Sequence, residues 1–388
     1  MLGRRQIVMG AAVTAGSAMI SPLAAAPFEW LRISPSDAGF ASDIEARLDK
    51  LIADKRVWGL HGVLVIRGRR IVLERYFEGE DNNWGQQLGV VRFGPDTLQN
   101  LYSVTKSVVA LLYGIALAEG KVPPPGAPLY AQFPEYQDLV ATDERRTQQT
   151  IAHALSMSLG AQWNEIGLAY DSPANDEVGM EMARDRYRFV LERPVTGAPG
   201  RRWHYSGGAT ALLGRLIAKG TGRSLPDYAR AALFDPIGLG RTEWVTSKDT
   251  WVFRQSGTGD GEPIAASGLR MTPRDLARIG QLILNRGQWR GRPVVPAEWL
   301  EKSFQPYFAV DEFRRYGYFW YVGDFKYGNP PNGPIAHWIG AFGYGGQRLF
   351  VLPELDMTVA ITAGNFADKD QWIPPIRVIR EVVLPSLL

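Results

Sequence analysis

The spacing of apolar residues predicts strands near both ends of the chain. In "HGVLVIRGRRIVLERYF", residues 61–77, two β-rich apolar runs flank the polar segment 67–69, a pattern typical of a hairpin. The stretch "GGQRLFVLPELDMTVAITAG", residues 345–364, has the same character around the turn at 353–354. Each stretch therefore predicts a pair of adjacent strands.

Apolar residues recur at helical spacing in most of the remaining chain. Ser42 and Glu45 form a capping-box pattern ahead of one amphipathic helix, and Thr272 with Pro273 begins another that ends at Gly287. Proline and glycine breaks separate the other predicted helices. These helices are expected at 103–120, 146–157, 177–192, 208–220 and 374–388.

Strands at both ends with helices between them indicate an α/β (α+β) fold with an inserted helical domain. With 388 residues, 45% of them hydrophobic, the chain can fill two cores. We expect residues 27–100 and 265–388 to form one discontinuous α/β domain, with an antiparallel sheet flanked by helices. Residues 101–264 would form the helical domain. The pattern does not give the order of the strands.

Composition excludes several classes of function. The 43 basic and 40 acidic residues are dispersed and nearly balanced, so neither nucleic acid nor an anionic membrane is expected as a partner. The absence of cysteine excludes disulfides and thiol chemistry. The four histidines are scattered without a metal-binding motif, so we expect no metal and no other cofactor. Oligomeric state is not indicated.

The first residues have the layout of a bacterial export signal. Arg4 and Arg5 precede a mild apolar stretch, and Ala24 to Ala26 provide a small-residue cleavage site. We expect the protein to be exported by the twin-arginine route and residues 1–26 to be removed, which places the protein in the periplasm or outside the cell. A retained anchor helix is the alternative. No later stretch has the charge-free length of a membrane span.

The segment "LYSVTKSVVA", residues 101–110, holds the main candidate for catalysis. Lys106 follows Ser103 by three positions at the start of a predicted helix, so the two side chains share one face. A serine hydroxyl becomes a good nucleophile when a base takes its proton, and a neutral lysine can be that base. Apolar surroundings set by Val104, Val108 and Val109, together with the helix dipole, favour the neutral amine.

A serine at this position has a plainer explanation, because serine often begins a helix only as its N-cap. Two observations favour catalysis. Lysine is scarce, with nine in the chain, and Lys106 alone follows a serine by three positions. Local sequence does not decide between these alternatives.

Two further segments could complete a catalytic site. In "PGRRWHYSGG", Tyr205 follows a Pro-Gly turn and precedes a helix, so its phenol could relay the serine proton. In "GAFGYGGQ", residues 340–347, glycines at a strand allow close backbone approach, and the N–H groups of Tyr344 and Ser103 could form an oxyanion hole. A core aromatic and an ordinary hairpin are the respective alternatives.

Together these motifs resemble the serine hydrolases related to class C β-lactamases and penicillin-binding carboxypeptidases. Within that group the chain is most similar to the 6-aminohexanoate-dimer hydrolases and β-lactamase-like esterases. The resemblance covers nearly the whole chain after the signal, including "YSVTKS", "SMSLGAQWNE", "PGRRWHYSGG", "SGLRMTPRDLARIG" and "GYGGQRLFVLPELD".

The resemblance implies a β-lactamase/transpeptidase-like fold and a role for each candidate residue. Ser103 would be the acylated nucleophile, Lys106 its base and Tyr205 the proton relay, with the Ser103 and Tyr344 amides as the oxyanion hole. It also implies that residues 163–176 cover the site as a lid, with Tyr170 facing the substrate.

The chain departs from β-lactamases of this kind at two motifs. Tyr205-Ser206-Gly207 replaces Tyr-x-Asn, and the strand lacks Lys-Thr-Gly, so a cation for a substrate carboxylate is missing. An uncharged ester or small amide is therefore favoured as substrate. A β-lactamase or D,D-peptidase, a linear amidase and an inactive binding scaffold remain alternatives. The expected substrate-binding residues are Trp163, Tyr170, Trp338, Phe342 and Gly343.

Overall fold

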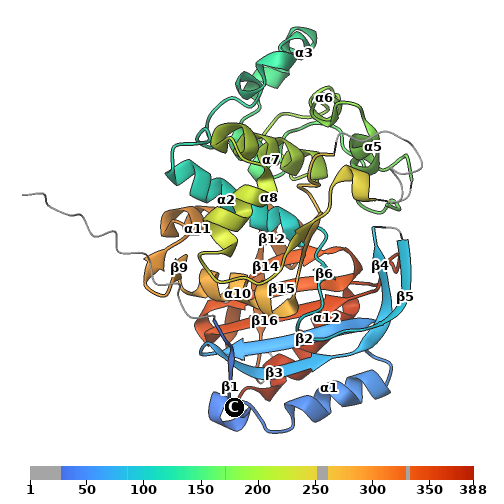
Figure 1. Ribbon diagram of the computed structural model, residues 1–388, viewed down its shortest axis with the longest axis vertical. Helices are drawn as coiled ribbons and strands as arrows, with labels where there is room; N and C mark the ends of the chain where they lie inside the picture. The colour runs from blue at the N-terminus through green and yellow to red at the C-terminus, as the bar shows by residue number, and fades with distance from the viewer. Residues whose placement is uncertain (1–27, 85, 171, 251–260, 329–332) are drawn as a thin grey trace, which may run out of the picture.

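Both ends of the chain contribute strands to one large sheet (Figure 1). The computed structural model describes residues 28–84, 86–170, 172–250, 261–328 and 333–388, so the predicted signal at 1–26 lies outside the described residues. Nine strands pair in the order β1-β3-β2-β16-β15-β14-β13-β12-β11. They are β1 (Leu31–Arg32), β2 (Leu60–Arg67), β3 (Arg70–Tyr76), β11 (Phe308–Ala309), β12 (Arg314–Tyr316), β13 (Tyr321–Lys326), β14 (Ile335–Gly343), β15 (Gln347–Leu352) and β16 (Met357–Ala363).

Both predicted hairpins are present in this sheet. β2 and β3 pair antiparallel, with Arg67 opposite Arg70, and β15 pairs with β16 across the turn Pro353–Leu355. Among the described residues, the strand pairs of this sheet are antiparallel except β1 with β3 at one edge. The parallel pair arises because the chain passes through a helix between β1 and β2. The sheet is therefore mixed.

One face of the sheet packs on α1 (Ile44–Ala53) and the C-terminal helical segment, which runs from α12 (Ile373–Arg377) into a π-turn at Val378–Val383 (Figure 1). Strand alternation divides the side chains between the two faces. Ile361 belongs to the core on this face, whereas Ala360 belongs to the core on the other face.

The opposite face packs on α10 (Pro273–Leu284) and α2 (Val104–Ala118), and α7 (Gly207–Thr221) lies on the far side of α2 (Figure 1). α10 begins as predicted, because the Thr272 side chain accepts a hydrogen bond from the Asp275 N–H. α2 is thus enclosed between the sheet and the helices. The start of α2 therefore lies between the sheet and the layer of helices that includes α7.

Smaller elements complete the fold. The helices are α3 (Asp138–Thr142), α4 (Ile151–Leu155), α5 (Asp176–Met182), α6 (Arg186–Leu191), α8 (Leu225–Ala229) and α11 (Ala297–Ser303). The strands are β4 (Glu78–Asn83) with β5 (Gln86–Arg92), β9 (Gln288–Trp289) with β10 (Arg292–Pro293), and the three-stranded sheet β6 (Gln99–Asn100), β8 (Leu269–Met271) and β7 (Glu243–Trp244).

Three local predictions were wrong. α1 has Asp43 as its N-cap without a side-chain cap, so the predicted capping box does not form. The helix predicted at 177–192 is two helices, because the Asp185 side chain accepts from backbone N–H groups and starts α6 anew. The helix predicted at 146–157 is a 3₁₀ segment followed by α4, which Thr150 caps.

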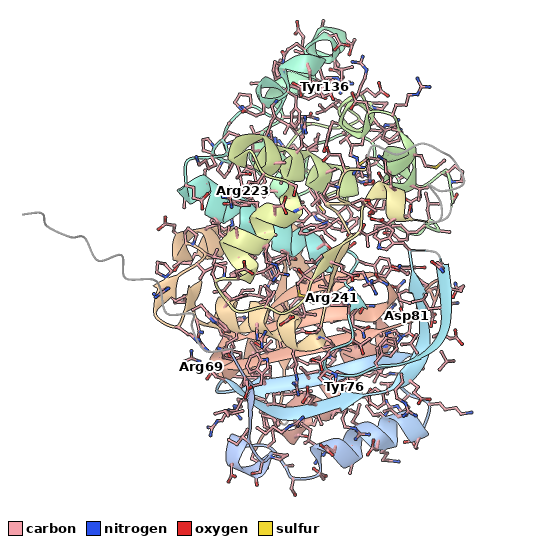
Figure 2. The ribbon with its side chains drawn as sticks, in the orientation of Figure 1. Arg69, Tyr76, Asp81, Tyr136, Arg223 and Arg241 are labelled. Carbon is pink, nitrogen blue, oxygen red and sulfur yellow. The ribbon has the colours of Figure 1, made fainter. Side chains whose placement is uncertain are left out.

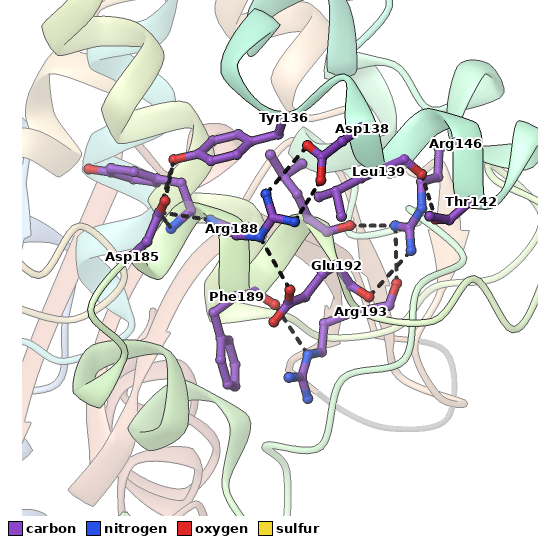
Figure 3. A network of polar contacts seen from close by, with 12 residues as sticks. Tyr136, Asp138, Leu139, Thr142, Arg146, Asp185, Arg188, Phe189, Glu192 and Arg193 are labelled. Carbon is purple, nitrogen blue, oxygen red and sulfur yellow. Dashed lines mark hydrogen bonds and ion pairs between the residues drawn. The ribbon is translucent and has the colours of Figure 1, made fainter.

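Arginine contacts fix the helical layer (Figure 3). The buried Arg146 guanidinium donates to the carbonyl oxygens of Leu191, Glu192 and Arg193, which are the free acceptors at the end of α6. Arg188 pairs with Asp138 at 2.6 Å on the surface, where such a pair adds little stability. The buried contact is therefore the one that holds α6 in place.

Candidate active site

Ser103 stands at the start of α2, on a backbone held in an uncommon conformation. Tyr102, the preceding residue, has φ = +46°, a left-handed value that costs a non-glycine residue on the order of 1–3 kcal/mol. Its hydroxyl donates to Asn82 Oδ1 at 2.7 Å, and the Leu101 N–H donates to the Leu269 carbonyl at 3.0 Å. These contacts stabilise the turn and leave the Ser103 side chain half-buried.

Lys106 contacts Ser103 as the spacing predicts. Its Nζ lies 3.0 Å from Ser103 Oγ and 3.1 Å from the carbonyl oxygen of Ala266, and its side chain is buried. Ser103 occupies the N-cap position of α2 but has helical dihedrals and makes no capping hydrogen bond. The side chain of Ser103 is therefore used by Lys106, which is against the simple N-cap interpretation.

Tyr205 joins this pair from the loop before α7. Lys106 Nζ lies 4.9 Å from the centroid of the Tyr205 ring, and Ser103 is close enough to the phenol to act on its pKa, which it lowers. Burial, and next the charge of Glu165, raise the pKa of the Tyr205 phenol well above its ordinary value. The phenol is thus neutral at rest and able to donate a proton.

Glu165 and Glu177, both buried, were missed by sequence reasoning. Glu165 Oε1 lies 3.9 Å from Lys106 Nζ, and Glu177 packs against Glu165. The expected apolar surroundings of the lysine amine are therefore wrong, because oxygen atoms of Ser103, Ala266 and Glu165 surround it. Glu165 ends the segment "SMSLGAQWNE" that carries the resemblance, but no role was assigned to it there, and Glu177 directly follows the predicted lid.

The end of β14 abuts the segment that carries Ser103. A Cβ atom on Gly343 would lie 2.2 Å from the Leu101 carbonyl oxygen, so a residue without a side chain is required. The ring of Tyr344 lies 5.4 Å from that of Tyr102 in an edge-to-face contact. The structure therefore brings Tyr344 and Gly343 beside the serine segment, and the oxyanion hole stays a prediction.

Tyr170 also reaches the site. Its ring lies 5.0 Å from that of Tyr344, and its hydroxyl lies 3.3 Å from Glu165 Oε1. Trp163 is buried in the helical core instead of lining an open surface, and its indole N–H donates to Glu165 Oε2 at 2.7 Å. The Trp163 indole therefore helps to hold the Glu165 carboxylate in place.

Trp338 and Phe342 are not brought to Ser103. Strand alternation on β14 turns both side chains toward the face covered by α1, where Trp338 packs with Phe325 and Phe350. Phe342 stacks on Tyr321, with the ring centroids 4.7 Å apart. The structure does not support Trp338 as a wall of the substrate pocket.

The described residues contain neither a metal-binding cluster nor a membrane-spanning helix. No group of three or more His, Cys, Asp or Glu side chains could hold a metal ion in the described part of the chain. None of the helices described combines the length and apolarity that a bilayer-spanning segment needs.

Comparison with known proteins identifies the family and the fold. The sequence profile of the Beta-lactamase family matches residues 44–381. The 6-aminohexanoate-dimer hydrolase of Paenarthrobacter ureafaciens is 24% identical over 352 residues, which cover 84% of this chain and 76% of that protein.

Two solved structures show the same fold. EstCE1, described as a hydrolase with promiscuous acyltransferase activity, superposes with a TM-score of 0.65 at 15% identity, covering 88% of this chain and 99% of that one. A class C β-lactamase from Rhodobacter sphaeroides has a TM-score of 0.60 at 17% identity, with coverages of 87% and 98%. The β-lactamase/transpeptidase-like fold implied by the motifs is confirmed, and the chain belongs to the Beta-lactamase family of hydrolases.

Proposed function

We propose that the protein is a serine hydrolase that cleaves carboxylic esters or small amides through an acyl-enzyme on Ser103. The observation that carries the proposal is the 3.0 Å contact between Lys106 Nζ and Ser103 Oγ beside the Tyr205 phenol. A nucleophile, a base within hydrogen-bond reach and a second proton carrier are the groups that acyl transfer needs.

The proton can be followed through these groups. Ser103 Oγ attacks the substrate carbonyl carbon, and its proton passes to Lys106 Nζ in its amine form. The Tyr205 phenol protonates the leaving group and regains a proton from Lys106, so one proton moves in total from Ser103 to the leaving group. Water then attacks the acyl-enzyme by the reverse route, which releases the acid and restores the Ser103 hydroxyl.

Labelling with a fluorophosphonate followed by intact-mass analysis tests this proposal. We expect a single adduct that maps to Ser103 and is absent from Ser103→Ala. Ser107, one helical turn along, is buried and donates to the Phe319 carbonyl at 2.6 Å, so Ser107→Ala should still be labelled. An unlabelled wild-type protein would favour a catalytically inactive binding scaffold.

Exposed apolar side chains on the predicted lid, and the lack of a cation on β14, favour an uncharged substrate with an apolar part. Ile166 and Leu168, in the segment between Glu165 and Tyr170, expose 71% and 36% of their surface. Strand β14 has no lysine or arginine to bind a substrate carboxylate. We therefore expect p-nitrophenyl butyrate to be turned over faster than nitrocefin.

A linear amide is the second candidate substrate. It is favoured by the similarity to the Paenarthrobacter ureafaciens 6-aminohexanoate-dimer hydrolase. A direct comparison of 6-aminohexanoate dimer with the butyrate ester would separate an amidase from an esterase, and faster nitrocefin hydrolysis would indicate a β-lactamase instead.

We further propose that the protein is exported, on the paired arginines and small residues of the segment 1–26. Cell fractionation with sequencing of the mature N-terminus is the test. A full-length protein in the cytoplasm would contradict it.

A further inference from the structure

Glu165 and Glu177 form a buried pair of carboxyl groups beside the catalytic lysine. The two side chains expose 2% and 3% of their surface. Their Oε2 atoms each lie 3.1 Å from the position that a Cβ of Gly207 would take. Glu177 Oε2 has no N–H or O–H donor among the described residues, and the carboxyl group of Glu165 lies beside it. Two buried carboxyl groups can bond to each other only when one of them carries a proton.

The contacts of each glutamate indicate where the proton resides. Glu165 Oε2 accepts from the Trp163 indole and the Gly207 N–H, both at 2.7 Å, and Lys106 lies at its other oxygen. Glu177 accepts from Ser267 Oγ at 2.5 Å and has no ion-pair partner among the described residues. Glu165 is therefore suited to the charged form and Glu177 to the protonated form.

The electrostatics agree with the geometry. Burial, and next the charge of Glu165, raise the pKa of Glu177 well above its ordinary value. Burial acts to raise the pKa of Glu165 as well, but Lys106, Glu177 and the N–H donors hold it below its ordinary value. Like charges this close cannot both be ionised in a buried site.

We propose that Glu165 and Glu177 share one proton and together hold the amine of Lys106 against Ser103. This inference rests on the proposed function. Glu165 links Lys106 on α2 to Gly207, two residues after Tyr205, and Glu177 binds Ser267, the neighbour of the Ala266 carbonyl that also contacts the amine. The two glutamates thus connect the start of α2, the start of α7 and the segment 266–267. Acylation requires these three segments to keep their relative positions. These two glutamates are positioning residues and need not touch the substrate.

Other ionisable groups also face the pair, and they bear on its pH dependence. Burial is the largest cause that raises the pKa of each tyrosine among these groups, and the negative charge of Glu165 also raises it. These tyrosines therefore stay neutral while the pair acts. The groups are Lys106 from α2, Tyr170 from the lid segment, Tyr205 before α7, Tyr316 from β12 and Tyr321 from β13.

Two glutamine variants distinguish the roles of the two residues. In Glu177→Gln the amide oxygen can accept from Ser267 and the amide N–H can donate to Glu165, so the variant mimics the protonated acid and should keep most of the wild-type kcat/KM. In Glu165→Gln the amide group lacks the charge facing Lys106, and we expect a loss on the order of a hundredfold from misplacement of the amine.

The pH profile of fluorophosphonate labelling separates positioning from a merely structural role. A nearby carboxylate favours the ammonium form of an amine, so Glu165→Gln should move the acidic limb to lower pH, whereas Glu177→Gln should not. Glu181→Gln, a buried carboxyl on α5 that pairs with Arg186 at 3.0 Å, is the matched control. It should lower Tm without moving the limb.

Each result supports or overturns the inference. A wild-type profile in Glu165→Gln, or a severe loss confined to Glu177→Gln, would overturn it while labelling of Ser103 left the proposed function intact. Infrared difference spectra at pH 8 give a test independent of activity. A protonated-carboxyl band in the wild-type protein that disappears in Glu177→Gln is expected, and its absence from the wild-type protein would refute the shared proton.

Discussion

Gly343→Ala tests whether the end of β14 contributes to catalysis. The backbone of Gly343, with φ = −132° and ψ = 159°, is extended, so alanine meets no conformational penalty there. Its methyl group, however, would lie 2.2 Å from the Leu101 carbonyl oxygen, where ordinary contact begins at 3.4 Å. The strand end or the serine segment must therefore move by about 1.2 Å, the difference between 3.4 and 2.2 Å.

A displacement of this size predicts two effects of different magnitude. Overpacking of this kind costs about 1–3 kcal/mol, which lowers Tm by only about 1–4 °C in a chain of this length. Movement of about 1 Å between Ser103 and the Tyr344 amide predicts a loss of kcat on the order of a hundredfold. Activity should therefore fall far more than stability does.

Steady-state hydrolysis of p-nitrophenyl butyrate, with Tm measured in parallel, checks this prediction. Gly126→Ala is the matched control, because a Cβ at Gly126 would meet no atom within 4 Å. If Gly343→Ala remained folded and as active as Gly126→Ala, the close approach of β14 to Leu101 would have no catalytic role.

Three further predictions concern Lys106, Tyr205 and Asp81. Lys106→Ala should abolish fluorophosphonate labelling of Ser103, and labelling at the wild-type rate would exclude lysine as the base. Tyr205→Phe keeps the ring over Lys106 but loses the hydroxyl, so turnover should slow by about a hundredfold or more with Tm little changed; full activity would remove Tyr205 from the proton path. Asp81 (Figure 2) lies on β4, and burial raises its pKa to about 6, so the folded protein holds a proton between pH 3.8 and 6 that the unfolded chain releases. Stability therefore falls as pH rises through this window, and Asp81→Asn should gain on the order of 2 kcal/mol over wild type above pH 6 in denaturant unfolding. The opposite effect of His61, whose pKa burial lowers to about 4, is common to both proteins and cancels in the difference.

The elements that could be predicted are those that local sequence determines. Apolar runs joined by short turns predicted the hairpins β2–β3 and β15–β16, and Thr272 with Pro273 predicted the start of α10. The predicted helix 177–192 is split because the Asp185 carboxylate accepts hydrogen bonds from backbone N–H groups just after it. The spacing of apolar residues does not reveal such a contact. The strand β4 was missed because its sequence, EGEDNN, has no apolar residue, and its partner β5 was missed with it.

The candidate site divides in the same way. Ser103 and Lys106 are three residues apart on one helix, so their contact follows from helical geometry and is present at 3.0 Å. Trp338 was misplaced because membership of a strand does not say which face is turned to the catalytic helix, and one position along β14 reverses the direction of the side chain.

Glu165 shows why the rest of the site could not be read from the sequence. The surroundings of a lysine amine depend on its neighbours in space, and the sequence near Lys106 contains no acidic residue. The fold brings a carboxyl 59 residues away in sequence, the difference between 165 and 106, to 3.9 Å from that amine. The contacts of the amine are therefore set by residues far from it in the sequence. For this reason variants of Glu165 and Glu177 are a sharper test of how the amine is held against Ser103 than any change on α2 itself.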